Sequence, residues 1–266
     1  MTARDIHTVG TLSGGVSSWG ACRRWVDRYG PDGMVLLFTD VGGDGTNPLV
    51  GEDPDTLRFR DEAAANLGVP LVNLRDGRDI WDVFAEKRWL GNSQLAHCSW
   101  ELKTKPAREW MDANVAPGAR VIVGIDITDI ARLPAIAQRW EPYRAAAPLT
   151  DKPLLWKPQL TRQLAVLGIK PSRMYELGFE HANCPGCVKA GHAHWLRLLT
   201  VMPERYAYAE AREQELRARL GDVAILRDRA DGASRPLPLR EFRERAEAGR
   251  AQLSLFDDGG CAFCAA

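Results

Sequence analysis

The stretch Thr8–Trp25, TVGTLSGGVSSWGACRRW, decides the fold. It is apolar up to Leu12, and after residue 18 it shows the helical spacing of Trp19 and Cys22, which is typical of a strand, a glycine turn and a helix. Adjacent glycines let a backbone approach a ligand, and the unpaired N–H groups of a helix N-terminus bind anions, phosphate above all. An ordinary strand-to-helix turn is the alternative. The residues expected to bind phosphate are Ser13, Gly14, Gly15, Val16, Ser17 and Ser18.

Strands and helices alternate on either side of this turn. The apolar run Met34–Phe38 is typical of a buried strand in a parallel sheet. Further strands are expected at 70–74 and 120–125, and helices at 55–67, 79–87 and 105–114. The pattern predicts an α/β fold, a parallel twisted sheet flanked by helices. Ligands bind beyond the carboxyl ends of such strands, so we expect Asp40, Gly124 and Asp126 to border the same crevice as the glycine turn.

Three segments of different character follow one another along the chain. Residues 1–150 form the predicted nucleotide-binding domain. Prolines become frequent after residue 130, and residues 151–250 are expected to form a helical subdomain that bears cysteines, with helices within 190–220 and at 239–248. Residues 251–266, which include Cys261 and Cys264, are expected to be a flexible tail.

Composition excludes several classes of protein. The 266 residues contain 35 Lys and Arg and 35 Asp and Glu, a balance that argues against a strongly basic surface coating nucleic acid. No apolar run is long enough to cross a bilayer, and the N-terminus lacks the apolar core of a secretory signal. We therefore expect a cytoplasmic protein without membrane association, whose six cysteines include metal ligands or reactive thiols.

The cysteines predict a metal or cluster site. Cys184 and Cys187 are two thiols separated by Pro-Gly, a spacing that can grip one metal ion or cluster. Cys98 is the third candidate ligand, and Cys261 or Cys264 is the fourth. An iron-sulfur cluster is the first interpretation and zinc the second, because the two Cys-x-x-Cys pairs are too far apart for a compact zinc finger. A thioredoxin-like redox pair and a tail without a role are the alternatives.

Other cysteines and histidines have simpler interpretations. Cys22 lies on the apolar face of the first helix and is expected to be core. His192 and His194 are two residues apart on a predicted helix, so at most one of them faces any given site, and surface positions are expected for both.

An ordered set of short motifs resembles a known family. SGGVSS at 13–18 resembles the PP-loop, usually SGGxDS, of the adenine-nucleotide α-hydrolase superfamily. FTDVG at 38–42, PLLW at 153–156, YELGF at 175–179 and NCPGC at 183–187 resemble segments of its phosphoadenylyl-sulfate (PAPS) reductase-like family in order and spacing. The resemblance implies a HUP/Rossmann-like fold that binds ATP or an adenylyl-sulfate nucleotide. It also implies a [4Fe-4S] cluster on Cys98, Cys184, Cys187 and one more ligand.

The chain departs from the family pattern at four places. Ser17 stands where the usual loop has aspartate, the residue that would serve a magnesium ion, so magnesium is a candidate cofactor without its usual ligand. Ser99 follows a single Cys98 where sulfonucleotide reductases have paired cysteines, and the tail lacks their Glu-Cys-Gly-Leu-His. Asp126 follows Gly124-Ile125 where those reductases tend to have arginine.

The resemblance implies chemistry at an α-phosphate. Fixed cations stabilise charge that develops at such a centre. The candidate cations are Lys103, Lys105, Arg132 and Arg139. An ATP pyrophosphatase would adenylate an acceptor oxygen, and sulfur would then displace AMP. One alternative is a sulfonucleotide reductase in which Cys261 or Cys264 is the catalytic nucleophile. Another is a non-catalytic subunit that binds nucleotide and cluster within a modification complex.

This hypothesis defines the expected partners. They are a nucleotide substrate, a sulfur-donor protein of the cysteine desulfurase or thioredoxin-like kind, and a nucleic acid as the acceptor. A homodimer is the expected candidate assembly.

Overall fold

The computed structural model describes residues 5–92, 95–229 and 232–249. The strands are β1 (Thr8–Thr11), β2 (Met34–Asp40), β3 (Leu71–Arg75), β4 (Arg120–Ile122), β5 (Arg144–Ala146), β6 (Leu226–Asp228) and β7 (Arg235–Leu237). The α-helices are α1 (Val16–Tyr29), α2 (Pro54–Leu67), α3 (Ile80–Lys87), α4 (Lys105–Asn114), α5 (Leu133–Trp140), α6 (Lys157–Val166), α7 (Arg173–Glu176), α8 (His192–Val201), α9 (Pro203–Leu220) and α10 (Leu239–Glu247). A π-helix, η1 (Ser99–Thr104), and the 3-10 helices η2 (Ile127–Arg132) and η3 (Pro148–Thr150) complete the described elements.

The main sheet has five parallel strands in the order β3-β2-β1-β4-β5. The chain moves outward from β1 to β3 and then returns to the other side of β1 to form β4. The connections therefore diverge between β1 and β4, and a crevice opens there at the carboxyl ends of the strands. The glycine turn follows β1, and Gly124 follows β4, so both lie at this switch point.

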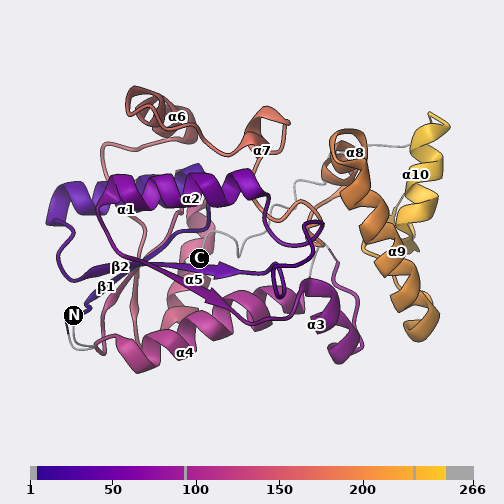
Figure 1. Cartoon of the computed structure of the whole chain (residues 1–266), viewed down its shortest axis with the longest axis horizontal. Helices are drawn as coiled ribbons and strands as arrows, with labels where there is room; N and C mark the ends of the chain where they lie inside the picture. Colours follow the sequence, from indigo (N-terminus) through magenta and orange to yellow (C-terminus); the bar gives the residue numbers. More distant parts are fainter. Residues whose placement is uncertain (1–4, 93–94, 230–231, 250–266) are drawn as a thin grey trace.

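Alternating strand residues fill a core on each face of the sheet. Met34 and Leu36 of β2 pack on the face covered by α1, α2 and α6. Val35 and Leu37 pack on the opposite face, beneath α4 and α5. Figure 1 shows α1 and α2 above the sheet and α4 below it. This three-layer arrangement confirms the α/β fold that the alternation of strands and helices predicts.

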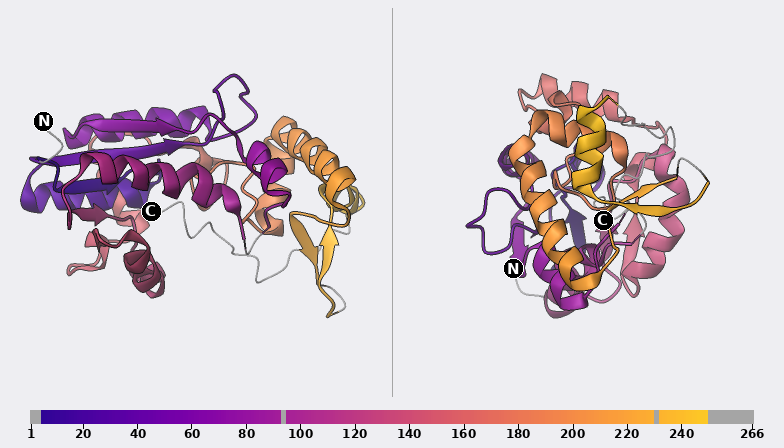
Figure 2. Two further views of the ribbon diagram at one scale, coloured as in Figure 1. Left: turned by 90° about the horizontal axis from the view of Figure 1, so that it is seen from below. Right: turned by 90° about the vertical axis from the view of Figure 1, so that its right-hand side faces the viewer.

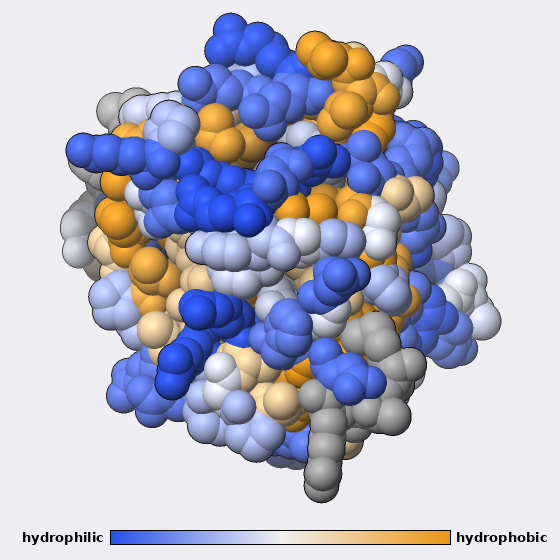
Figure 3. All heavy atoms as spheres, turned by 90° about the vertical axis from the view of Figure 1, so that its left-hand side faces the viewer, coloured by the Kyte–Doolittle hydropathy of each residue, from blue (hydrophilic) through white to orange (hydrophobic). Residues whose placement is uncertain are grey.

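The C-terminal helices form a separate layer at one end of the sheet. Helices α8, α9 and α10 lie beyond this end, beside the antiparallel hairpin of β6 and β7 (Figures 1 and 2). They share an apolar core with α3, which includes Trp81, Trp195 and Phe242. At the opposite end of the molecule, hydrophobic residues lie in small groups among hydrophilic ones (Figure 3), as is usual for a protein surface.

Short elements depart from the expected pattern. The segment after Ile130, expected to be helical, also contains β5, which adds a fifth strand beside β4. The hairpin of β6 and β7 was not expected either. Strands β5, β6 and β7 are each only three residues long, too short to show the alternation that marks a strand. No helix within residues 5–92, 95–229 and 232–249 is both long and apolar enough to span a membrane.

A buried carboxylate joins the C-terminal elements. Glu213 of α9 is fully buried, and its two oxygens accept hydrogen bonds from the N–H groups of Ile225 (2.9 Å) and Leu239 (2.6 Å). These two residues begin the segments that form β6 and α10, so the side chain ties both to α9. Burial raises the pKa of Glu213 from 4.5 to about 7.

This pKa predicts that stability falls with rising pH. Between pH 4.5 and 7 the folded state binds the Glu213 proton more tightly than the unfolded state does, so unfolding releases a proton. The free energy of unfolding should therefore fall by about 3 kcal/mol across this window. Glu213→Gln should flatten the dependence, which urea unfolding at pH 5 and pH 8 would measure for both proteins. An equal pH dependence in both would contradict the assignment.

Candidate functional site

The glycine turn is closed by the side chain of Ser18. Its Oγ donates to the carbonyl oxygen of Gly15 (2.8 Å) and accepts from the N–H of Ser13 (3.2 Å). Gly14 has a positive φ of 78°, and a Cβ there would lie 2.5 Å from a methyl carbon of Thr56, so this position requires glycine. Helix α1 then begins at Val16, with Gly15 as its N-cap and no acidic residue in its first turn. The positive partial charge at the N-terminus of α1 is therefore not neutralised by an acidic side chain of the helix itself.

Gly124 allows the end of β4 to touch this helix start. A Cβ on Gly124 would lie 2.7 Å from the amide nitrogen and 2.8 Å from the Cα of Ser18. Both atoms belong to the backbone of the first turn of α1, which cannot move alone. The close approach fixes the position of the loop relative to β4.

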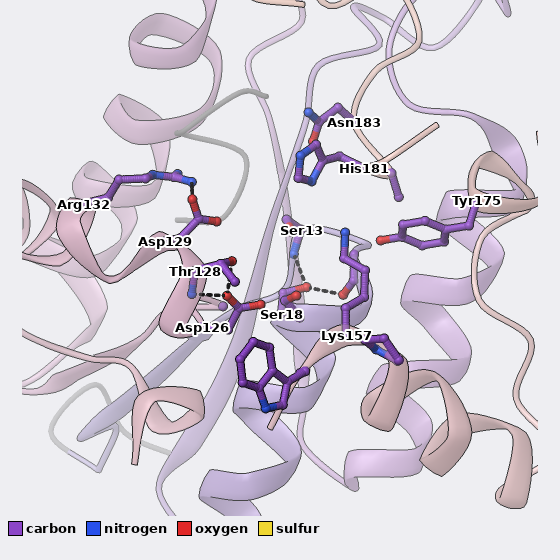
Figure 4. Close-up of a pocket in the computed structure, with 16 residues that line it drawn as sticks. Ser13, Ser18, Asp126, Thr128, Asp129, Arg132, Lys157, Tyr175, His181 and Asn183 are labelled. Carbon is purple, nitrogen blue, oxygen red and sulfur yellow. Dashed lines mark hydrogen bonds and ion pairs between the residues drawn. The ribbon is translucent and has the colours of Figure 1, made fainter. Parts of the chain in front are cut away.

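A cavity of about 310 Å³ lies at this junction. Ser13, Gly15, Ser17 and Ser18 line it from the loop, and Gly124 and Asp126 line it from the segment after β4. The volume is at the lower end of the range for small-molecule sites. Its remaining lining residues are Thr128, Asp129, Arg132, Trp156, Lys157, Pro158, Tyr175, His181, Ala182 and Asn183. Figure 4 shows Arg132 and Tyr175 on opposite sides of Ser13 and Ser18, and Lys157 close to the two serines.

Two cations and two carboxylates lie in the cavity wall. Arg132 forms an ion pair with Asp129 at 3.0 Å, whereas Asp126 accepts from the backbone N–H (2.9 Å) and the hydroxyl (2.6 Å) of Thr128. Lys157 donates to the carbonyl oxygen of Glu180 at 2.7 Å. Loss of solvent lowers the pKa of Lys157, so an anion near its ammonium would be stabilised more strongly than at the open surface.

His181 adds a titratable group that the sequence did not single out. The pKa of its imidazole is lowered, first by loss of solvent and then by the neighbouring Lys157 ammonium. A lowered pKa favours the neutral ring at neutral pH. A neutral imidazole accepts a proton, so the cavity contains a candidate general base.

Several predicted site residues lie away from this cavity's lining. Asp40 is buried, forms an ion pair with Arg75 and accepts from the N–H of Gly42 at 2.8 Å. Lys105 is exposed at the start of α4. Arg139 lies in α5, where burial lowers its pKa. Of the four predicted catalytic cations, Arg132 lines the cavity.

Lys103 lies between the glycine turn and the cysteines. It lines a cavity of about 30 Å³ with Ser13, and a second cavity of about 20 Å³ with Cys98. Its ammonium forms an ion pair at 3.0 Å with Glu52, whose side chain is 1% exposed. The π-helix η1 accounts for its position, because a π-turn spans five residues and places Lys103 on the same side as Cys98.

The second of these cavities brings three predicted ligands together. Cys98, Cys184 and Cys187 all line it, although they come from segments more than eighty residues apart. Cys22 lies elsewhere, in the core beneath α1, where burial raises its pKa to about 12. The prediction that Cys22 is a core residue is confirmed.

The cavity lined by Cys98, Cys184 and Cys187, here called the cysteine cavity, is not arranged as a metal site. Among the described residues, no three His, Cys, Asp or Glu side chains are arranged so that they could hold a metal ion. A volume of about 20 Å³ is close to that of one water, so an eight-atom cluster would require Cys98, Cys184 and Cys187 to move apart. The other candidate ligands, Cys261 and Cys264, lie outside the described residues.

His194 holds the turn between two of the cysteines. Its Nε2 is 2.7 Å from the carbonyl oxygen of Pro185, and its ring packs 4.8 Å from that of Phe179. His192 contacts the carbonyl oxygen of Arg227 at 3.0 Å. The prediction that both histidines lie on the helix surface is therefore wrong, because each is partly buried against a neighbouring segment.

The fold and the cavity define an α/β protein in which a glycine turn and a helix N-terminus open into a cavity at the switch point of a parallel sheet. No protein-family profile and no curated protein matches the sequence. Among solved structures, it is similar to phosphoadenylyl-sulfate (PAPS) reductase from Candida auris, determined as a phosphate complex. That similarity has 15% sequence identity and a TM-score of 0.42, and it covers 65% of this chain and 79% of the reductase chain. At this level of similarity no residue role is transferred.

Proposed function

We propose that this protein is a PP-loop enzyme that binds ATP or an adenylyl nucleotide and acts at its α-phosphate in sulfur transfer or nucleotide modification. One observation carries the proposal: the N-terminus of α1 opens into a cavity of about 310 Å³ that also contains Arg132 and Lys157. A helix N-terminus and two fixed cations suit a polyphosphate. The sequence resemblance to the PAPS reductase-like family supports adenine nucleotides among such ligands.

The proposed reaction has two bond exchanges. An acceptor oxygen forms a bond to the α-phosphorus, and the bond to the β-phosphate oxygen breaks, so pyrophosphate leaves with the electron pair. A hydrosulfide-type sulfur donor then attacks the carbon that bears the adenylated oxygen, the bond between this carbon and the oxygen breaks, and AMP leaves with the electron pair. His181 accepts the proton of the acceptor hydroxyl, and Arg132 and Lys157 stabilise negative charge at the phosphates.

We also propose that the cysteine cavity binds an iron-sulfur cluster once Cys98, Cys184 and Cys187 have moved apart to admit it. Three thiols from two segments that are distant in sequence line one cavity, together with the side chains of Lys103 and Lys189. Thiolates ligate iron, and the two lysines would offset part of the negative charge of a thiolate-ligated cluster. When bound, a cluster would supply thiolate-coordinated iron and inorganic sulfide next to the nucleotide site.

Replacing Lys157 tests the catalytic proposal. Lys157→Met removes a cation from the cavity and should lower the rate of AMP and pyrophosphate release about 100-fold when ATP and candidate acceptors are supplied. Lys170→Met removes an exposed lysine outside the cavity and should leave the rate unchanged. Equal rates in the two variants would contradict a role for Lys157. Absence of AMP and pyrophosphate with the unaltered protein would favour a non-catalytic binding subunit.

A further inference from the structure

Tyr175 connects the glycine turn to the segment that leads into the cysteines. It belongs to α7 and lines the cavity of about 310 Å³ beside the glycine turn. The N–H of Val16, at the start of α1, donates to the Tyr175 hydroxyl at 3.2 Å. The N–H of Ala182 also donates to it, and Ala182 is two residues before Cys184. One oxygen therefore joins two parts of the site that are far apart in sequence.

The Tyr175 hydroxyl can still donate one hydrogen bond. A phenol oxygen donates one hydrogen bond, and two N–H donors occupy its acceptor positions. Among the residues that the structure describes, no acceptor for the Tyr175 proton is found. Figure 4 shows the ring directed toward the serines of the loop. The nearest place for an acceptor is thus the cavity itself, at the N-terminus of α1.

The surroundings of the hydroxyl favour an anionic acceptor. The Lys157 ammonium lies 5.4 Å from the centre of the Tyr175 ring. A Cβ added to Gly15 would lie 3.5 Å from the hydroxyl oxygen, which shows how closely the ring approaches the loop. A phosphate oxygen at the first turn of α1 would therefore meet backbone N–H groups, an ammonium and a phenol proton together.

We propose that Tyr175 donates a hydrogen bond to a phosphate oxygen of the bound nucleotide and thereby links nucleotide binding to the segment at Ala182. The inference rests on the proposed function and deepens it. A bound phosphate fixes the hydroxyl, and the fixed hydroxyl holds the N–H of Ala182 in place. Nucleotide occupancy then orders the chain immediately before Cys184, so the cysteine cavity responds to the nucleotide without direct contact.

Calorimetric titration with ATP and hydrogen exchange test this link. Tyr175→Phe removes the hydroxyl and should weaken ATP binding about tenfold, which corresponds to about 1.4 kcal/mol. In the unaltered protein ATP should slow exchange at the Ala182 amide, and in Tyr175→Phe this amide should exchange fast with or without ATP. Tyr143→Phe is the matched control, because its hydroxyl donates to Asp112 at 2.8 Å, outside the cavity.

The outcomes separate the inference from the proposed function. If the unaltered protein does not bind ATP, the proposed function fails. If it binds ATP but Tyr175→Phe binds equally well, or if ATP leaves exchange at Ala182 unchanged in the unaltered protein, the role of Tyr175 is wrong. The exchange measurement on the unaltered protein decides this even if the variant does not fold.

Discussion

Replacing Gly124 with alanine should abolish nucleotide binding and lower the stability of the fold. The new Cβ would lie 2.7 Å from the amide nitrogen of Ser18 and 3.0 Å from the carbonyl carbon of Ser17. Overpacking of this kind costs about 1–3 kcal/mol. Relief requires the end of β4 and the first turn of α1 to separate. The N–H groups of that turn and the wall formed by Asp126 would then no longer face the same phosphate.

Thermal unfolding and ATP titration measure the two effects. For a chain of this size each kcal/mol corresponds to about 2–4 °C in Tm. Gly15→Ala is the control for stability, because its Cβ would lie 3.5 Å from the Tyr175 hydroxyl, an ordinary contact, and its Tm should be unchanged. A Gly124→Ala protein that binds ATP with unaltered affinity would show that the close approach is not needed for the site.

The sheet could be predicted because its central strands are buried on both faces. Such strands appear as continuous apolar runs, and Met34–Phe38 is one of them. The strand itself continues to Asp40. The edge strand β5 has no such run, since its residues are exposed or half-buried, and it exists because β4 provides a partner for its backbone. Pairing of this kind is a tertiary effect that local sequence does not contain.

The candidate site could be predicted in part for a similar reason. The glycine turn is local, so SGGVSS was sufficient to predict the turn and the helix that begins after it. Lys157 and His181 line the same cavity although they lie more than 130 residues further along the chain. Nothing in their own neighbourhood marks them, because their position depends on how α6 and the segment before Cys184 fold back over the switch point. The YELGF motif did contain Tyr175, but its hydrogen bonds are visible only in the structure.

Sequence patterns also do not predict the π-helix η1. An α-helix would turn Lys103 away from Cys98, whereas the wider turn of η1 puts both on one side. The sequence therefore named both residues without indicating that they lie together. Their proximity is what connects the cysteine cavity to Ser13, since Lys103 lines a cavity with each.

Replacing Cys184 with alanine should abolish iron and sulfide binding. Cys184 lines the cysteine cavity with Cys98 and Cys187, and loss of one thiol from a three-thiol wall leaves too few ligands to retain a cluster. Protein purified without oxygen should be brown with a broad absorbance near 400 nm, roughly as for other thiolate-ligated clusters, and the variant should be colourless. Iron and acid-labile sulfide analysis of both proteins gives the measurement.

Cys22→Ala provides the matched control for this experiment. Cys22 is fully buried in the core beneath α1, and the raised pKa of its thiol disfavours the thiolate that metals require. Its removal costs packing but should leave iron and sulfide content unchanged. Stoichiometric zinc without iron or sulfide in the unaltered protein would contradict the proposed cluster and indicate a zinc site with thiolate ligands. Equal iron content in Cys184→Ala and the unaltered protein would show that the cluster is not bound in the cysteine cavity, because a cluster held there depends on every thiol that lines it.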